Sequence, residues 1–290
     1  MLSIAIPKGS LEEQTLLLFA QADLEIKKSA REYNPVVNDP RITKVKILRP
    51  QEIPTYVEEG YFDIGISGRD CITEGGADVV EVADMPYAKT GTGKLKMVIA
   101  VPEGSKVNEP KDIVPGSRVS TEFPKTTQKY FDELGISVNI FFSYGATEAK
   151  VPELMDVIVD LTETGQTLRR NHLKIIGVIL ESTTKLIANK AAWADPVKRN
   201  AIEEIRTLLL GVIDARGKVL ISMNVPAGRL EAVIAALPAM KNPTVAQLYN
   251  SDYLEVTTVV EKSQVNLLVP ELKAQGAEDI LELAISKIVR

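Results

Sequence analysis

The segment DVIVDLTETGQTLRRNH, Asp156–His172, predicts a strand, a turn and the start of a helix in direct succession. Val157, Ile158 and Val159 are β-branched apolar residues, which favour a buried strand. Asp160 interrupts them, and TETGQT then places hydroxyl groups around a single glycine. A buried strand that ends in a carboxylate and a Thr/Gly turn indicates a ligand site in an α/β fold, because ligands bind there at the carboxyl ends of strands.

Short apolar runs alternate with helical patterns over residues 1–210, which predicts an α/β protein with largely parallel sheets. The predicted strands are SIAIP, KVKIL, FDIGIS, LKMVIAV, VNIFFS, DVIVDL and TTKLIAN. Ser10 is the expected cap of the first helix, with Glu13 at capping-box spacing. Another helix is expected to begin near Pro196, with Asp195 as its cap.

The C-terminal part has a different pattern. After Gly217, KVLISMNV predicts a strand and Pro226 opens a helix. VAQLYN and YLEVTTVVE predict two more strands, and a helix over residues 263–275 precedes the last strand, ILELAISKIV. The order βαββαβ is that of the ferredoxin-like unit, so we expect a separate small domain. Pro270 lies inside its second helix and is expected to remove one helical hydrogen bond.

The composition excludes several classes of function. The 290 residues are 45% hydrophobic and 25% charged, as in an ordinary globular protein, and the net charge of −5 argues against nucleic acid or an acidic membrane as partners. Cys71 is the only cysteine and His172 the only histidine, so cysteine-rich zinc sites and paired-histidine metal sites are excluded. No signal-peptide pattern or membrane-spanning run is present, and we expect a cytoplasmic protein.

The turn after Asp160 predicts a phosphate site. Gly165 allows the backbone to turn tightly and approach a phosphate, and Thr162, Thr164 and Thr167 add hydroxyl donors. Asp160 itself repels phosphate and suits sugar hydroxyls or a hydrated Mg²⁺. The alternative is a polar strand-to-helix turn with a capping threonine. A P-loop is excluded, because no Gly-Lys-Ser/Thr sequence follows the glycine.

Three further segments carry charged residues near expected strand ends, and each has two interpretations. Lys8 is either an anion contact at a helix N-terminus or a surface lysine in a turn. Lys89, Lys94 and Lys96 surround two glycines, in a segment that faces an anion or connects two domains. Glu148 follows an apolar strand and suits ribose or metal, or simply the first turn of a helix.

Together these segments resemble the ATP phosphoribosyltransferase family, which catalyses the first step of histidine biosynthesis. The resemblance rests on IPKGSLEEQ, RPQEIPTYVEEGYFDIGISGRD, YGATEAKVPEL and DVIVDLTETGQTLRRNHLKII. MNVPAGRLEAVIAALPAMKNPTV and LKAQGAEDIL resemble the regulatory domain of the long form. The resemblance implies two periplasmic-binding-protein-like (type II) lobes with the active site in their cleft, followed by a C-terminal ferredoxin-like (βαββαβ, ACT-like) domain.

The resemblance also implies the limits of the domains and the reaction. Residues 1–90 and 183–210 are expected to form lobe I, residues 91–182 lobe II, which binds phosphoribosyl pyrophosphate, and residues 211–290 the regulatory domain. The implied reaction joins N1 of the ATP adenine to C1 of phosphoribosyl pyrophosphate, giving N1-(5-phosphoribosyl)-ATP and pyrophosphate. Mg²⁺ is the implied cofactor, histidine the implied inhibitor, and a homo-oligomer of dimers that assemble into hexamers the implied state.

Residue roles follow from the same resemblance. The expected catalytic residues are Asp160, Glu148 and Lys8, of which Asp160 and Glu148 also face the metal. The expected phosphoribosyl pyrophosphate site comprises Glu163, Thr164, Gly165, Gln166, Thr167 and Arg49. The nucleotide site comprises Ser10, Arg69 and Lys89, and the histidine pocket comprises Asn224, Met240, Thr244 and Val259.

Two positions depart from the family pattern. Ser10 stands where the family usually has an arginine near the nucleotide, so Arg69 or Lys89 takes over that contact or Ser10 serves only as a helix cap. Asn224 replaces an acidic residue often found in the inhibitor pocket, which changes the expected strength of histidine binding.

Two other functions suit a two-lobed protein. Prephenate dehydratase combines such a catalytic region with a regulatory domain, but its Thr-Arg-Phe and Glu-Ser-Arg-Pro segments are absent here. A solute-binding protein has the same two lobes but normally carries an export signal or a DNA-binding domain, and neither pattern is present. The dehydratase also has no need of the phosphate turn, so the transferase is the preferred interpretation.

Overall fold

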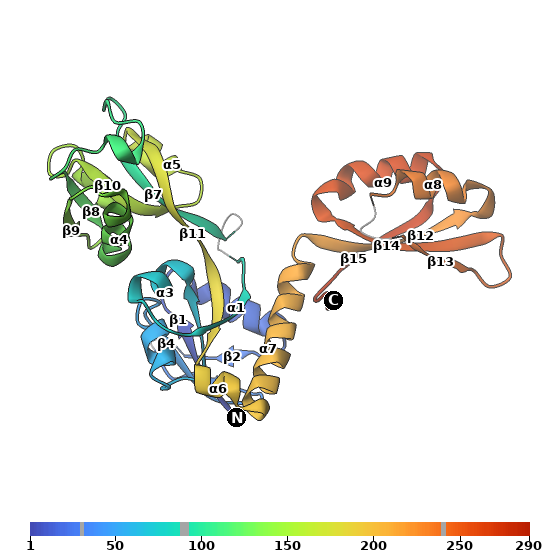
Figure 1. Ribbon diagram of the computed structural model, residues 1–290. Helices are drawn as coiled ribbons and strands as arrows, with labels where there is room; N and C mark the ends of the chain where they lie inside the picture. The colour runs from blue at the N-terminus through green and yellow to red at the C-terminus, as the bar shows by residue number, and fades with distance from the viewer. Residues whose placement is uncertain (30–31, 88–92, 239–241) are drawn as a thin grey trace. The chain divides into compact units, whose positions relative to one another are not determined.

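The computed structural model describes residues 1–29, 32–87, 93–238 and 242–290 (Figure 1). The chain divides into two compact units, Met1–Arg206 and Thr207–Arg290. In the described ranges, no helix is both long enough and apolar enough to cross a membrane.

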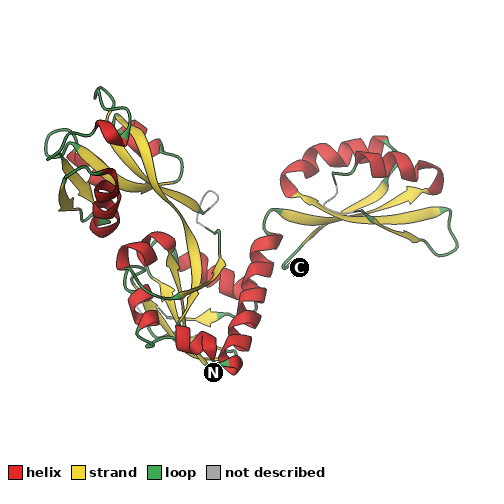
Figure 2. Cartoon of the chain, viewed as in Figure 1, coloured by secondary structure: helices red, strands yellow, loops and turns green. Residues whose placement is uncertain are grey.

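The first unit contains a nine-stranded mixed sheet with helices on its faces (Figure 2). Its strands are β1 (Leu2–Pro7), β4 (Ile42–Leu48), β5 (Ile64–Gly68), β6 (Val80–Asp84), β7 (Lys94–Pro102), β8 (Arg118–Thr121), β9 (Asn139–Phe142), β10 (Val157–Thr162) and β11 (Leu173–Ala188). The helices are α1 (Glu12–Gln21), α2 (Ile53–Glu58), α3 (Arg69–Gly75), α4 (Pro124–Leu134), α5 (Gln166–Arg170), α6 (Lys190–Ala194) and α7 (Pro196–Ala215), and short 3₁₀ helices are η1 (Pro110–Asp112) and η2 (Thr147–Lys150). A separate two-stranded sheet pairs β2 (Ile26–Lys27) with β3 (Val36–Val37).

Strand β11 joins the two halves of the large sheet (Figure 1). It pairs antiparallel with β7 up to Thr183 and antiparallel with β5 from Thr184 onward. Around β1 and around β8 the neighbouring strands are parallel. The prediction of largely parallel sheets is therefore only partly right. Strands β7 and β11 carry the chain between the two halves in opposite directions and so pair antiparallel, and apolar runs in a sequence do not indicate direction.

The central strands are buried on both faces, which explains their continuous apolar runs. Val157 and Val159 of β10 contact the hydrophobic cluster that includes Phe131 of α4, whereas Ile158 faces the opposite cluster with Leu168 of α5. Each such side chain stabilises the fold by about 1.5–3 kcal/mol on burial. The run ends at Asp160, so the carboxylate lies where β10 leaves the core.

The two predicted helix caps have different outcomes. Helix α1 begins after Leu11 and has no side-chain cap, so the prediction that Ser10 caps it is wrong. A backbone bond from Glu12 N–H to the Gly9 carbonyl, at 3.1 Å, forms the turn before the helix instead. The prediction for α7 is confirmed, because Asp195 Oδ1 accepts from the N–H groups of Val197 and Lys198 at 2.8 and 3.2 Å.

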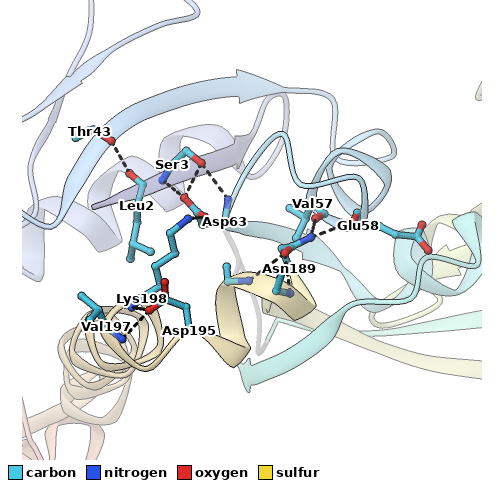
Figure 3. Close-up of polar contacts among 12 residues, drawn as sticks. Leu2, Ser3, Thr43, Val57, Glu58, Asp63, Asn189, Asp195, Val197 and Lys198 are labelled. Atoms are coloured by element: carbon cyan, nitrogen blue, oxygen red, sulfur yellow. Dashed lines mark hydrogen bonds and ion pairs between the residues drawn. The ribbon is translucent and has the colours of Figure 1, made fainter.

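Polar contacts of Asp63, the residue directly before β5, link β5 to β1 and to α7 (Figure 3). Asp63 accepts hydrogen bonds from Ser3 N–H at 2.7 Å and Ser3 Oγ at 2.9 Å, and Lys198 Nζ lies 2.6 Å from its other oxygen. Burial raises the pKa of the Asp63 carboxyl, but Lys198 and Ser3 outweigh burial and leave that pKa below its ordinary value. Nearby, Asn189 caps α6 and donates to the carbonyls of Val57 and Glu58.

The second unit is a four-stranded antiparallel sheet in the order β13-β14-β12-β15, with two helices on one face (Figure 1). Its elements are β12 (Lys218–Pro226), η3 (Ala227–Arg229), α8 (Leu230–Ala236), β13 (Thr244–Gln247), β14 (Tyr253–Glu261), η4 (Lys262–Gln264), α9 (Val265–Ala274) and β15 (Glu278–Ala284). The predicted βαββαβ order and the proline inside α9, Pro270, are confirmed. Alternate residues of β12 form its core with α8 and α9: Val219, Ile221, Met223 and Val225.

Candidate active site

The carboxyl ends of β10, β8 and β9 lie at one edge of the sheet, because these three neighbouring strands are parallel. Asp160 lies near the end of β10, Glu122 directly follows β8, and Glu148 lies in η2 after β9. Burial, together with the charges of Glu148 and Glu122, raises the pKa of Asp160 to about 6, against the opposing effect of a hydrogen bond from Leu161 N–H. The Asp160 carboxyl therefore titrates near neutral pH, in the field of two other carboxylates.

The turn after β10 is held by its own side chains. Thr162 Oγ1 accepts from Gly165 N–H at 2.8 Å, and Thr164 Oγ1 accepts from Gln166 N–H at 3.4 Å. Gly165 has a φ of +70° and precedes α5, so the predicted strand, turn and helix are confirmed. Both hydroxyl groups use their oxygens inside the turn and keep their O–H donors for another acceptor. Thr167 lies exposed in the first turn of α5.

A cavity of about 350 Å³ lies beside this edge. Its wall comes from the turns after β1, β5 and β8 and from β10 and β11, and includes Ser10, Leu11, Asp70, Cys71, Tyr87, Leu95, Glu122, Phe123, Leu161, Glu163, Ser182 and Thr184. No lysine or arginine of the described ranges lines it. A cavity with apolar walls, carboxylates and hydroxyls suits a flat group that donates hydrogen bonds better than it suits a phosphate.

The sequence analysis missed Asp70 and Glu122. Asp70 is 7% exposed, and its Oδ1 accepts a hydrogen bond from Ser182 Oγ at 2.6 Å. Asp70 lies two residues after β5, so the same strand-end rule that found Asp160 would have found it. Glu122 was missed because the four-residue strand before it was not predicted. Burial and the neighbouring Asp70 raise the pKa of the Cys71 thiol, which excludes Cys71 as a thiolate nucleophile.

The predicted cationic contacts lie in different places. Lys8 Nζ donates to the hydroxyl of Tyr33 at 2.6 Å and lies 4.4 Å from the centre of its ring. Arg49 is exposed just after β4. Arg69 does not share the cavity of Ser10 but lines a second one of about 460 Å³, together with Lys94, Lys96 and Lys185. Lys89 lies outside the described residues.

The predicted metal contacts, Asp160 and Glu148, are electrostatically coupled neighbours. Within the described ranges, no group of three or more His, Cys, Asp or Glu side chains is arranged to hold a metal ion. Mg²⁺ commonly keeps several waters and binds through one or two carboxylates plus substrate phosphates. The pair therefore fits a magnesium ion that arrives with a phosphorylated substrate better than it fits a permanent metal site.

The predicted histidine pocket is only partly brought together. Thr244 and Val259 line one cavity of about 560 Å³ in the second unit. Asn224 is not part of its wall; its side chain instead donates to Asp279 Oδ2 at 2.9 Å. Met240 lies outside the described residues.

Comparison with known proteins identifies the family. The model of the ATP phosphoribosyltransferase family matches residues 49–211, and that of its C-terminal domain matches residues 215–287. The ATP phosphoribosyltransferases of Pelotomaculum thermopropionicum and Desulforudis audaxviator are 48% and 47% identical, with 99% of each chain covered. The solved ATP phosphoribosyl transferase (HisG:HisZ) complex from Thermotoga maritima contains a chain that is 28% identical, with a TM-score of 0.61, over 72% of this chain and 99% of that one.

These matches confirm the predicted fold class, two periplasmic-binding-protein-like lobes and a ferredoxin-like C-terminal domain. They favour the transferase over the dehydratase-like and solute-binding alternatives. The predicted domain limits and site residues stay predictions. With matches along nearly its whole length, the chain belongs to the ATP phosphoribosyltransferase family.

Proposed function

We propose that the chain condenses ATP with phosphoribosyl pyrophosphate, the first step of histidine biosynthesis, at the edge where β8, β9 and β10 end. The enzyme is a pentosyltransferase by family. One observation supports the assignment of the site: Asp160 lies near the end of β10, Glu148 follows β9 at the same edge of the sheet, and the turn with Gly165 leaves β10 there. Carboxylates for a ribose thus lie beside a glycine turn for its phosphate.

Residues Glu163–Thr167 cradle the 5′-phosphate in this proposal. A Cβ at Gly165 would lie 3.1 Å from the Ile175 side chain and 3.2 Å from that of Arg169, so only glycine fits the turn in its present form. The Thr164, Gln166 and Thr167 side chains are exposed and supply donors. Arg49 and Lys8 supply positive charge for the phosphates, which suits a substrate that carries several phosphate groups.

Asp160 and Glu148 accept hydrogen bonds from the ribose hydroxyls and tolerate the positive charge that develops at C1. Aligned charges of this kind are usually the largest single contribution to transition-state stabilisation. Mg²⁺, held between these carboxylates and the substrate, would offset the negative charge of the departing pyrophosphate. Asp160 acts in its ionised form, which predominates above a pH of about 6.

The adenine lies in the cavity of about 350 Å³. Its apolar walls suit a flat base, and Glu122, Glu163 or Asp70 can accept from the adenine amino group. Adenine N1 is itself the nucleophile, so no covalent enzyme intermediate is required. Correct placement of the two substrates supplies several kcal/mol of the rate enhancement. Ser10 lines this cavity, whereas Arg69 lines a different one. Arg69 and Lys89 are assigned to the triphosphate.

Histidine inhibition and self-association complete the proposal. The cavity lined by Thr244 and Val259 supports a small-molecule site for histidine in the second unit. Asn224, which is not part of its wall, is left out of this site. The enzyme is proposed to act as a homo-oligomer, dimers that assemble into hexamers.

One experiment tests the function. The protein is mixed with ATP, phosphoribosyl pyrophosphate and Mg²⁺, and both pyrophosphate release and the new ultraviolet absorbance of the modified adenine are followed. Turnover that needs both substrates supports the proposal, and its absence would favour a binding role. Histidine is then added; turnover that it does not inhibit would remove the regulatory part and leave the catalytic part standing.

A further inference from the structure

The side chain of Lys150, two residues after Glu148, has no place in the mechanism above. Its ammonium group hydrogen-bonds to Ser143 Oγ and lies 3.4 Å from Ser120 Oγ. Ser120 and Ser143 are each 1% exposed, so the ammonium reaches into the interior of the sheet edge. Among the residues that the structure describes, no carboxylate lies within ion-pair distance of it. A partly buried charge bound only to neutral hydroxyls is costly unless the surroundings carry opposite charge.

The surroundings of Lys150 carry that charge. Asp160, Glu122 and Glu148 lie at or after the carboxyl ends of the neighbouring parallel strands β10, β8 and β9. The Lys150 ammonium lies at the same edge, bound to Ser120 of β8 and to Ser143 directly after β9. The Lys150 ammonium thus brings a positive charge to the strand ends from which these acids extend. A substrate with several phosphate groups approaches three carboxylates more easily when a cation offsets them.

Lys150 also closes the turn that carries Glu148. Ser143 Oγ, which accepts from the ammonium, bonds to Thr147 Oγ1 at 2.9 Å and accepts from Gly145 N–H at 3.3 Å. Between these contacts Ala146 has a φ of +47°, a conformation that is strained for a residue with a Cβ. The network therefore holds a strained backbone in place, and the strained turn sets where the Glu148 carboxylate lies.

We propose that Lys150 is a positioning residue for phosphoribosyl transfer. Through Ser143 it holds the Glu148 turn in the conformation that faces the ribose, and its charge allows the polyanionic substrate to approach three carboxylates. This inference rests on the proposed function, because it assigns the ribose and pyrophosphate end of the substrate to this edge. It adds a residue that acts through Glu148 rather than one that contacts the reacting atoms.

The test compares Lys150→Met, Lys150→Arg and Ser143→Ala with the wild-type enzyme, each substrate being varied in turn. Lys150→Met should raise the KM for phosphoribosyl pyrophosphate and lower kcat by about tenfold each, as expected for one lost charge-assisted contact. The KM for ATP should stay within about twofold, since the adenine cavity is not lined by Lys150. Lys150→Arg should recover most of the activity that Lys150→Met loses. Ser143→Ala keeps the charge of Lys150 and should lose less activity than Lys150→Met. The matched control is Lys111→Met, at an exposed lysine of η1.

Other outcomes would overturn the proposal. If Lys150→Met lowered the Tm but left the kinetic constants unchanged, Lys150 would have only a structural role. Equal rises in the KM values for both substrates would lead to the same conclusion. If Lys150→Met does not fold, Lys150→Arg and Ser143→Ala decide: wild-type constants in both reject the proposal. Failure of the wild-type enzyme to turn over the two substrates would reject the proposed function itself, so the two failures are distinguishable.

Discussion

The turn after β1 and the turn after β10 both lead from a parallel strand into a helix, but they are built differently. The turn after β10 is closed by two threonine oxygens and a glycine at positive φ, and it lies beside carboxylates. The turn after β1 also contains a glycine at positive φ, Gly9, but it is closed by backbone bonds alone and has no side-chain cap. The side chain of its lysine, Lys8, contacts Tyr33 from a distant segment. One turn is ordered by its own residues, and the other depends on a residue from elsewhere.

This difference predicts different sensitivities to mutation. In the turn after β10, backbone and acid positions are set locally, so single changes should remove a specific part of the substrate site. In the turn after β1, the position of the Lys8 ammonium is set by an exposed contact, which contributes little energy. We therefore expect the large effects on the β10 side and the small ones on the β1 side.

The largest effect is expected for Asp160→Asn. The amide keeps the size of the side chain but removes the charge that faces the developing positive charge at C1. The value of kcat/KM for phosphoribosyl pyrophosphate should fall by about 10²–10³, as for loss of one preorganised transition-state contact. Steady-state kinetics of pyrophosphate release measures it. Asp132→Asn, at an exposed aspartate of α4, is the control, and near-normal constants in Asp160→Asn would remove this edge from the site.

The same substitution should have an opposite effect on stability. The pKa of Asp160 rises from 3.8 in the unfolded chain to about 6 in the folded protein, so the folded state loses stability as the pH rises between these values. Above pH 6 the ionised carboxylate costs about 3 kcal/mol. Asp160→Asn should therefore raise the Tm at pH 8 and leave it almost unchanged at pH 4. A Tm shift of equal size at both pH values would contradict this account.

Gly165→Ala is expected to be next in size. Residues with a Cβ are strained at its φ of +70°, and the new methyl group would crowd the Ile175 and Arg169 side chains. The free energy of unfolding should fall by about 1–2 kcal/mol, and the KM for phosphoribosyl pyrophosphate should rise about tenfold as the turn shifts. Urea unfolding and kinetics together measure this. Gly104→Ala is the control, since nothing lies within 4 Å of a Cβ added there.

Thr167→Ala should have a moderate effect. The hydroxyl is exposed and is assigned to the phosphate alone, so its loss should raise the KM for phosphoribosyl pyrophosphate about fivefold. Stability should stay within about 0.5 kcal/mol, because the residue lies at the surface. Inhibition by inorganic phosphate, used as a competitor of phosphoribosyl pyrophosphate, should weaken by a similar factor. Inhibition by phosphate that is unchanged while the KM rises would show that Thr167 acts somewhere other than on the phosphate.

The sequence predicted the β10 turn well and the course of β11 poorly, for physical reasons. The β10 run is buried on both faces, so three β-branched residues and a turn glycine suffice to recognise it. Strand β11 has 16 residues, but only its last six were predicted. Register shifts between Ile175 and Gly177 and between Val178 and Leu180 interrupt the alternation of its first half. A strand is recognised in a sequence by the alternation of apolar and polar residues, and irregular strand pairing interrupts that alternation.

The candidate site, too, could be predicted from the sequence only in part. The rule that ligands lie at the carboxyl ends of strands singles out Asp160 and Glu148 from the sequence alone, and the two carboxylates are neighbours at one edge of the sheet. The rule does not separate Arg69 from Asp70, which are adjacent in the sequence but line different cavities. Neighbouring side chains point to different sides of a backbone, and the sheet order that decides which cavity each side meets is a property of the whole fold. Long-range contacts of this kind, such as Lys8 with Tyr33, leave no local pattern.

The smallest expected effect, in Tyr33→Phe, tests the comparison most finely. Phenylalanine keeps the ring beneath the Lys8 ammonium and removes the hydroxyl that accepts its hydrogen bond at 2.6 Å. Because Tyr33 is 44% exposed, the loss should be about twofold in the KM for phosphoribosyl pyrophosphate, against about fivefold for Tyr33→Ala, which also removes the cation–π contact. Tyr249→Phe, at a tyrosine that is 92% exposed, is the control. If Tyr33→Phe instead matched Asp160→Asn in size, the β1 turn would be as sensitive to substitution as the β10 turn, and the contrast between them would not hold.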